Sequence, residues 1–294
     1  MVLKPKLVVE SKCIIGEGPV WDSATNTLYF IDILGRALYH WDGKSLDKSI
    51  SFDQSLGFAV LREKGGVVAG LEKGYYYADF DGKPAQQVAD PEPNREDGRF
   101  NDGKVDPAGR VWGGTMPTSL DTGYGEAGPD SALYCMDENQ KIKTMLTGVI
   151  QGNGLCWTKD TKKFYFVDTQ KFCVQEFDYD IERNELSNGR VCVEVPNEKG
   201  IPDGMTIDDD GNIWLALWGG HGVAKYDPKT GEELAFVELP VLNATSCCFG
   251  GEKLDELYIT TASLGTDLAQ YPLAGSVFKV QPGVTGRPSY KYKG

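Results

Sequence analysis

Hydrophobic and polar residues alternate along this chain in short runs typical of β-strands, and Gly, Asp, Asn and Lys gather in the turns between them. The runs form units: each opens with a polar residue and a glycine, continues as a strand, crosses a turn and adds a strand rich in aromatic and β-branched residues. The opening glycines are Gly18, Gly57, Gly103, Gly154 and Gly204. Stretches with helical periodicity are scarce, and strands do not alternate with helices, which favours an all-β fold.

The spacing of these glycines, roughly 40 to 50 residues, is typical of β-propeller blades. A sixth unit begins near Ser246 without the glycine. We therefore predict an all-β fold, a six-bladed β-propeller with a central channel. No Pro/Ser-rich linker divides the chain, so we expect residues 1–294 to form a single domain. The segment Lys6–Val9 is expected to add the outer strand of the last blade and so close the ring without a long open sheet edge.

Composition narrows the possible partners and the compartment. The formal net charge is −13 and the pI about 4.7, which argues against nucleic acid or an anionic membrane as a partner. The N-terminus, MVLKPKLVVE, lacks the apolar run of a signal peptide, and the odd number of cysteines, seven, forms no regular framework. We expect a cytoplasmic protein with free thiols, either a monomer or a weak dimer.

The scarcity of histidine excludes much of the usual hydrolytic chemistry. The chain has only two histidines, His40 and His221, and no GxSxG, P-loop or HExxH motif. A Ser-His-Asp system or a histidine-rich zinc site would have to be built from one of these two residues. Two sequences that resemble calcium loops, DYDIERNELSNG and IDDDGNIW, lack the glycine that such a loop requires and are interpreted as turns.

The residues just before the opening glycines point to a metal site. In a propeller the first strand of each blade lines the channel, so equivalent positions on these strands converge on the axis. The residues at this position are Glu17, Leu56, Asp102, Asn153 and Asp203. Four of the five carry oxygen donors, and carboxylates crowded at one axis repel one another unless a cation lies between them. Asp or Asn before Gly is also ordinary in turns, so an explanation by turn chemistry alone stays open.

Several long motifs then resemble one known family. GEGPVWD, RFNDGKVDPAGRVWGGTM, GNGLCW, IPDGMTID and TSCCFGG occur in this order, and the likeness extends to the ending AGSVFKVQPGVTG. The chain thereby resembles the family of regucalcin (senescence marker protein 30) and gluconolactonase. The resemblance implies a six-bladed propeller that binds one divalent metal ion and hydrolyses a sugar lactone to an aldonic acid. Animal members have also been described as calcium-binding regulators.

Carried over by motif, the resemblance implies that Glu17, Asn153 and Asp203 are the metal ligands. Asp102 is then expected to lie behind them or to line the channel. The substrate-contacting pair of the family falls on Arg99 and Asn101. The family's glutamate after GTM is absent here, where Pro117-Thr118-Ser119 follows, and Ser119 takes its position in the pocket. The insertion from Ser119 to Asp130 also differs from the family's pattern.

The expected chemistry follows from this ligand set. Two carboxylates and an amide suit Ca, Zn, Mn, Mg or Fe(II) and leave coordination positions open for water and substrate. The expected metal would polarise the lactone carbonyl and acidify a bound water, while Asp203 acts as both ligand and general base. The alternatives are a calcium-binding regulatory protein, or a phosphotriesterase or aryl esterase on the same scaffold. Insect relatives described as luciferin-regenerating enzymes are a further, narrower alternative.

Overall fold

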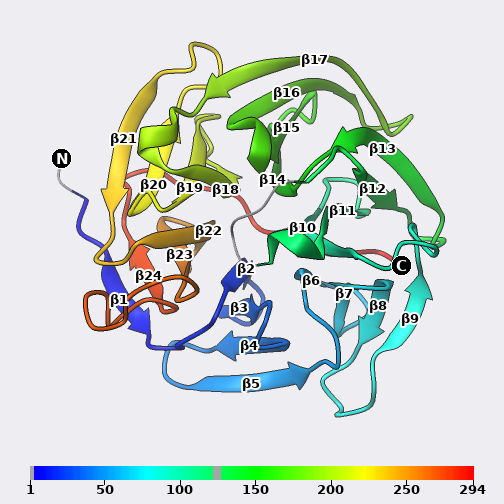
Figure 1. Cartoon of the computed structure of the whole chain (residues 1–294), viewed down its shortest axis with the longest axis horizontal. Coiled ribbons are helices and arrows are strands. Elements are labelled where there is room, and N and C mark those ends of the chain that lie inside the picture. Colours follow the sequence, from blue (N-terminus) through cyan, green and yellow to red (C-terminus); the bar gives the residue numbers. More distant parts are fainter. Residues whose placement is uncertain (1–2, 122–126) are drawn as a thin grey trace.

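The computed structural model describes residues 3–121 and 127–294, which form six four-stranded antiparallel sheets arranged radially around one axis (Figure 1). The prediction of an all-β, six-bladed propeller is confirmed. Each of the first five blades is one continuous segment of chain whose strands run in sequence order from the axis outward. The first strand of every unit is therefore the innermost strand of its blade, as the repeat predicted.

The strands of the first three blades are β2 (Gly16–Asp22), β3 (Thr27–Asp32), β4 (Ala37–Trp41) and β5 (Leu46–Ser51), then β6 (Phe58–Leu61), β7 (Val67–Leu71), β8 (Gly74–Ala78) and β9 (Gln86–Ala89), then β10 (Gly98–Val105), β11 (Val111–Pro117), β12 (Ser131–Met136) and β13 (Ile142–Val149). The next two blades are β14 (Gly152–Trp157), β15 (Lys163–Asp168), β16 (Cys173–Asp180) and β17 (Glu185–Glu194), then β18 (Ile201–Ile207), β19 (Ile213–Trp218), β20 (Gly222–Tyr226) and β21 (Glu233–Glu238). Among the described residues, three short 3-10 helices lie in the connections: η1 (Thr118–Leu120), η2 (Thr169–Lys171) and η3 (Asn197–Lys199).

The last blade joins the two ends of the chain. Its inner strands are β22 (Asn243–Gly250), β23 (Glu256–Ala262) and β24 (Val277–Val280), and its outer strand is β1 (Lys6–Val9). β1 runs antiparallel to β24, with Lys6 opposite Lys279 and Leu7 opposite Phe278. Because the N-terminal strand completes the C-terminal blade, unrolling the ring would require breaking this strand pair.

The hydrophobic core consists of six clusters, one between each pair of neighbouring blades. The opening glycines allow the blades to approach closely at the axis. A Cβ on Gly57 would lie 2.2 Å from the carbonyl oxygen of Phe100, and one on Gly154 would lie 2.8 Å from that of Asp203, each in the next blade. A larger residue at either position would push the inner strands apart and displace the side chains that these strands place near the axis.

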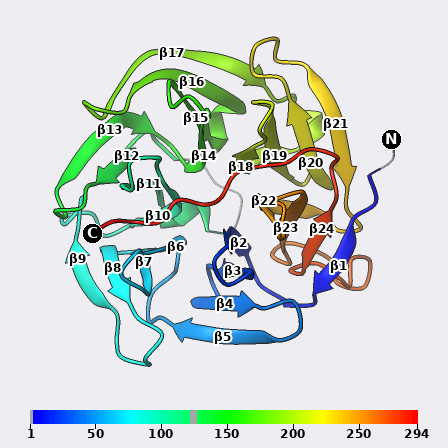
Figure 2. The ribbon, with the colours of Figure 1, turned by 180° about the vertical axis from the view of Figure 1, so that it is seen from behind.

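The C-terminal segment after β24 crosses the face seen in Figure 2 and contacts every blade. Tyr292 is fully buried between the second and third blades, where its hydroxyl donates to the carbonyl oxygen of Asp137 at 2.7 Å. Backbone hydrogen bonds along the segment join Thr285 to Asp209, Gly286 to Leu254, Tyr292 to Leu61 and Glu63, and Lys293 to Gly109. Side chains add Arg287 to the carbonyl of Trp157 and Lys291 to Asp22. The segment covers one end of the channel.

Both sequences that resemble calcium loops are turns. In the first, the Asp180 carboxylate accepts hydrogen bonds from the backbone N–H groups of Glu182 and Arg183. In the second, Asp208 accepts from the indole of Trp214 at 3.0 Å and pairs with Lys225. These aspartates bind backbone N–H groups and neighbouring side chains within the protein. Their presence in the two turns is therefore explained without a metal ion.

Candidate active site

A β-bulge interrupts the inner strand of five of the six blades near the position just before the opening glycine. The strand register shifts after Glu17 in β2, at Asp102 in β10, after Asn153 in β14, across Asp203 in β18 and before Ser246 in β22. A bulge bends its strand and turns a side chain away from the regular alternation. β6 begins only at Phe58 and pairs without such a shift, and Leu56 before it is fully buried.

The three predicted ligands border one small cavity of about 50 Å³ at a channel mouth. Glu17 and Asn153 are buried, and Asp203 keeps partial exposure. The Asn153 side chain donates through Nδ2 to Asp203 Oδ1 at 2.5 Å. The other residues around the cavity are Ile15, Ile33, Asn101, Gln151, Thr169, Gln170, Ile201 and Trp218. The structure thus brings together residues that the sequence separates by 186 positions (203 − 17).

Burial and neighbouring charge act on the carboxyl groups of this site. Burial raises the pKa of Glu17 well above its ordinary value, and the carboxylates of Asp203 and Asp102 raise it further. Burial likewise raises the pKa of Asp203, with a contribution from Asp102. The pKa of Asp102 is raised by burial, against which Lys104 acts. Three carboxyl groups so placed either retain protons or share a cation.

Glu17, Asn153 and Asp102 each accept a hydrogen bond from the backbone N–H of the glycine that follows. The N–H of Gly18 donates to Glu17 Oε2 at 2.5 Å, and the N–H of Gly154 donates to Asn153 Oδ1 at 3.1 Å. Asp102 accepts in the same way from the N–H of Gly103 at 2.7 Å. An oxygen that accepts one such bond retains a lone pair for another partner. These side-chain oxygens are therefore fixed in place and still have a lone pair with which to coordinate a metal ion.

This donor set fits a divalent cation. Two carboxylates balance the charge of the ion, and the amide adds a neutral oxygen, a combination that hard and borderline cations accept. Within residues 3–121 and 127–294, no group of three His, Cys, Asp or Glu side chains is arranged to hold a metal. The candidate set differs from such a group because its third member is the amide of Asn153.

Two further aspartates, which do not belong to the position before the opening glycines, support the strands that carry the ligands. Asp32 accepts from the backbone N–H groups of Ile14 and Ile15, at 2.9 and 3.0 Å, just before Gly16-Glu17. Asp168 accepts from the N–H of Gln151 at 3.0 Å, just before Gly152-Asn153. Both aspartates end a motif that occurs twice in the sequence, YFID at 29–32 and YFVD at 165–168, and this repeat could have identified them.

Arg99 and Asn101 lie beside the site. Asn101 borders the cavity and donates to the carbonyl oxygen of Gly152 at 3.0 Å. Arg99 is buried, and its guanidinium donates to Asn101 Oδ1 at 3.0 Å and to Asp121 Oδ1 at 2.6 Å. Asp121 is a third residue, one that no sequence motif marks, because its contact with Arg99 depends on the course of the chain after β11.

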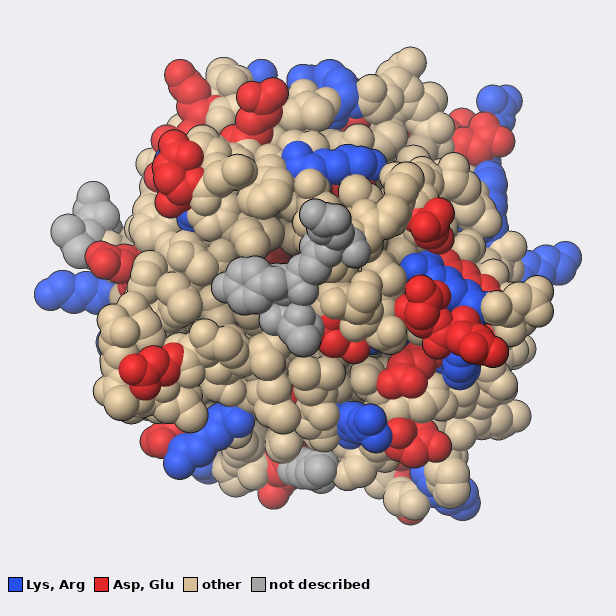
Figure 3. Space-filling view, in the orientation of Figure 1, with Lys and Arg blue, Asp and Glu red and all other residues tan. Residues whose placement is uncertain are grey.

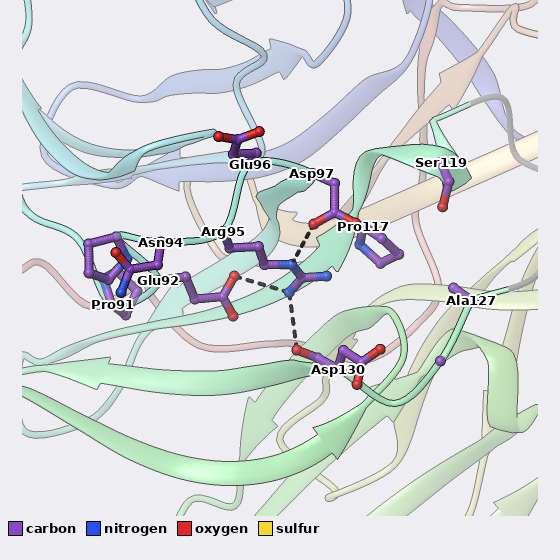
Figure 4. A pocket seen from close by; sticks show the side chains of 12 residues that line it. Pro91, Glu92, Asn94, Arg95, Glu96, Asp97, Pro117, Ser119, Ala127 and Asp130 are labelled. Carbon is purple, nitrogen blue, oxygen red and sulfur yellow. Dashed lines mark hydrogen bonds and ion pairs between the residues drawn. The ribbon is translucent and has the colours of Figure 1, made fainter.

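Ser119 lies apart from this cavity. It is exposed in η1 and borders a larger cleft of about 910 Å³ that also contains Glu92, Arg95 and Asp130 (Figure 4). In that cleft Arg95 pairs with Glu92 and Asp97, away from Ser119. The structure does not bring Ser119 among the residues around the predicted ligands. Part of the predicted insertion at 119–130, residues 122–126, lies outside the described residues.

Acidic side chains are spread over the face shown in Figure 3, with Lys and Arg between them. Interspersed charges weaken any field that would draw a polyanion to this face. Across the described residues, no helix has the length and apolar character needed to cross a bilayer. All seven cysteines are buried and free, as expected for thiols that act as small hydrophobic residues.

Fold and site together define a six-bladed propeller with two carboxylates and an amide gathered at one mouth of its channel. Residues 15–263 match the model of the SMP-30/gluconolactonase/LRE-like family, and the chain belongs to this family. Regucalcin from Bos taurus is 38% identical over 302 residues, which cover 99% of both chains.

Two solved structures extend the comparison. A luciferin-regenerating enzyme is 32% identical with a TM-score of 0.90, over 99% of each chain. A calcium-binding protein, regucalcin, from Agrobacterium tumefaciens has a TM-score of 0.91 at 24% identity, over 100% of this chain and 98% of that one, and supports the fold.

Proposed function

We propose that this protein hydrolyses a sugar lactone with the help of one divalent metal ion held by Glu17, Asn153 and Asp203. The observation that carries the proposal is the convergence of these three side chains on one cavity, from three different blades. Membership of a family that includes gluconolactonases supports the lactone as the substrate class.

The raised pKa values of Glu17 and Asp203 favour this use of the site. Carboxyl groups that burial and mutual repulsion drive toward the protonated form lose that strain when a cation shares the space. A divalent ion bound there would supply Lewis acidity to a lactone carbonyl and lower the pKa of a water molecule.

The side chains around the cavity then have separate tasks in the proposed reaction. Asp203 accepts a proton from the attacking water as the new C–O bond forms, and that proton passes to the ring oxygen as the ester bond breaks. Asn101, which borders the cavity, binds a substrate hydroxyl or the ring oxygen. Arg99 holds Asn101 in place and adds positive charge on the side where the substrate's oxygens lie.

The test compares three substrates on the same preparation: gluconolactone, an organophosphate triester and an aryl ester. The protein is stripped with a chelator and reloaded separately with Ca²⁺, Zn²⁺, Mn²⁺, Mg²⁺ and Fe²⁺. We expect lactone hydrolysis to exceed the other two activities and to require an added ion. Faster turnover of the triester or aryl ester would overturn the lactone assignment, and binding of an ion without any hydrolysis would favour a calcium-binding regulator.

A further inference from the structure

Thr169 connects two of the three predicted ligands. It is the first residue of η2, directly after β15, and is buried. Its hydroxyl accepts a hydrogen bond from Asn153 Nδ2 at 3.0 Å and donates one to the carbonyl oxygen of Pro202 at 3.0 Å. Pro202 precedes Asp203 on β18, so the hydroxyl joins the fourth blade to the fifth beside the site.

The direction of these bonds fixes the Asn153 amide. A threonine hydroxyl has one hydrogen, and here it is donated to Pro202. The hydroxyl therefore presents only a lone pair to Asn153, and only the NH₂ end of the amide can face it. The second NH₂ hydrogen goes to Asp203 Oδ1. Asn153 Oδ1 is then the accepting end of the amide, and beside the N–H of Gly154 it has a lone pair left for an ion.

Thr169 is itself held firmly. Its backbone N–H donates to the carbonyl oxygen of Gln151 at 3.1 Å, two residues before Asn153. The preceding residue, Asp168, accepts from the N–H of Gln151 and pairs with Lys171 at 2.9 Å. The hydroxyl is therefore placed by the same segment of backbone that carries Asn153.

We infer that Thr169 is a positioning residue for the metal site. It orients Asn153 so that Oδ1 is presented as a ligand, and through Pro202 it holds the backbone of Asp203. The inference rests on the proposed metal site and adds to it a residue that acts through Asn153 and Asp203. Loss of a hydrogen-bond partner behind a metal ligand lowers metal affinity by about 10- to 100-fold.

The test is calorimetric titration of the chelator-treated full chain with Zn²⁺, Mn²⁺ and Ca²⁺, using for the variants whichever ion the wild type binds most tightly. Thr169→Val keeps the shape and removes the hydroxyl, so we expect about 10- to 100-fold weaker binding. Thr169→Ser keeps the hydroxyl and should bind nearly as the wild type does. The matched control is Thr261→Val, since Thr261 is also buried and its hydroxyl donates to Ser276 O, with no bond to Asn153 or Pro202.

Melting temperatures of the metal-free variants separate positioning from general packing. Wild-type affinity in Thr169→Val, or an equal loss in Thr261→Val, would overturn the inference while leaving the proposed function intact. If the wild type binds none of the ions, the proposed metal site itself fails. Should Thr169→Val not fold, Thr169→Ala is titrated in its place, and unchanged affinity there would equally overturn the inference.

Discussion

Replacing Asp203 by Asn should slow catalysis and at the same time raise the melting temperature of the metal-free protein. In the metal-free protein, burial of much of the Asp203 side chain and the nearby Asp102 carboxylate raise the pKa of Asp203 well above 3.8. An amide of the same shape removes the negative charge and still offers an oxygen to Asn153 Nδ2. The substitution therefore removes a partly buried charge without opening a cavity.

The substitution is expected to raise the stability of the metal-free protein and to lower the rate of hydrolysis. Each pKa unit relieved corresponds to about 1.4 kcal/mol, or roughly 2 °C in melting temperature for a chain of this length. Removal of a general base typically lowers the rate by about 10²- to 10⁴-fold. Loss of a direct ligand should weaken metal binding at least as much as loss of a residue behind it, by about 100-fold or more.

The assays are thermal unfolding of the chelator-treated protein and hydrolysis of gluconolactone with added metal. Asp168→Asn is the matched control, because that carboxylate accepts backbone N–H groups and pairs with Lys171. An amide NH₂ facing those donors should lower the stability of the metal-free protein by about 2 kcal/mol. Equal destabilisation in both variants, or full activity in Asp203→Asn, would refute the reasoning.

Three other outcomes are expected. Arg99→Ala should raise KM by about tenfold or more with a smaller change in kcat, measured by steady-state kinetics on gluconolactone; an effect on kcat alone would contradict a binding role. The pKa values of Glu17 and Asp203 are raised by burial and neighbouring carboxylates, so the folded metal-free protein holds protons that the unfolded chain releases near its ordinary values of 4.5 and 3.8. The stability that these protons contribute is present below those values and is lost as the pH rises through the raised pKa values. The melting temperature of the metal-free protein should therefore fall as the pH rises above about 5, and saturating metal should remove the fall. Tyr292→Ala should lower the free energy of unfolding in urea by about 3–5 kcal/mol, since this fully buried ring anchors the segment that crosses all six blades; a loss below about 1 kcal/mol would show that the segment adds little.

The sequence predicted the fold and the convergence of the donors because both follow from one regular feature. A glycine-led strand recurs in every unit but the last, and the position before the glycine lies on the innermost strand. Glu17, Asn153 and Asp203 therefore occupy equivalent places in three blades, and that equivalence could be recognised without coordinates.

Contacts that depend on the path of irregular segments could not be predicted from the sequence. Asp121 meets Arg99 only because of the path that the chain takes after β11, and Ser119 faces a different cleft for the same reason. Thr169 carries no motif of its own, and its role appears only when β14 and β18 lie side by side. The C-terminal segment is held partly by backbone hydrogen bonds, which no side-chain pattern encodes.

The most direct test of the central claim is a stoichiometric titration. Chelator-treated protein is titrated with a divalent ion while gluconolactone hydrolysis is followed, for each of Ca²⁺, Zn²⁺, Mn²⁺, Mg²⁺ and Fe²⁺. If Glu17, Asn153 and Asp203 hold the ion that the reaction requires, activity returns with at least one ion and saturates at one equivalent per chain. Full activity in the metal-free protein, or no activity with any of the ions, would contradict the account.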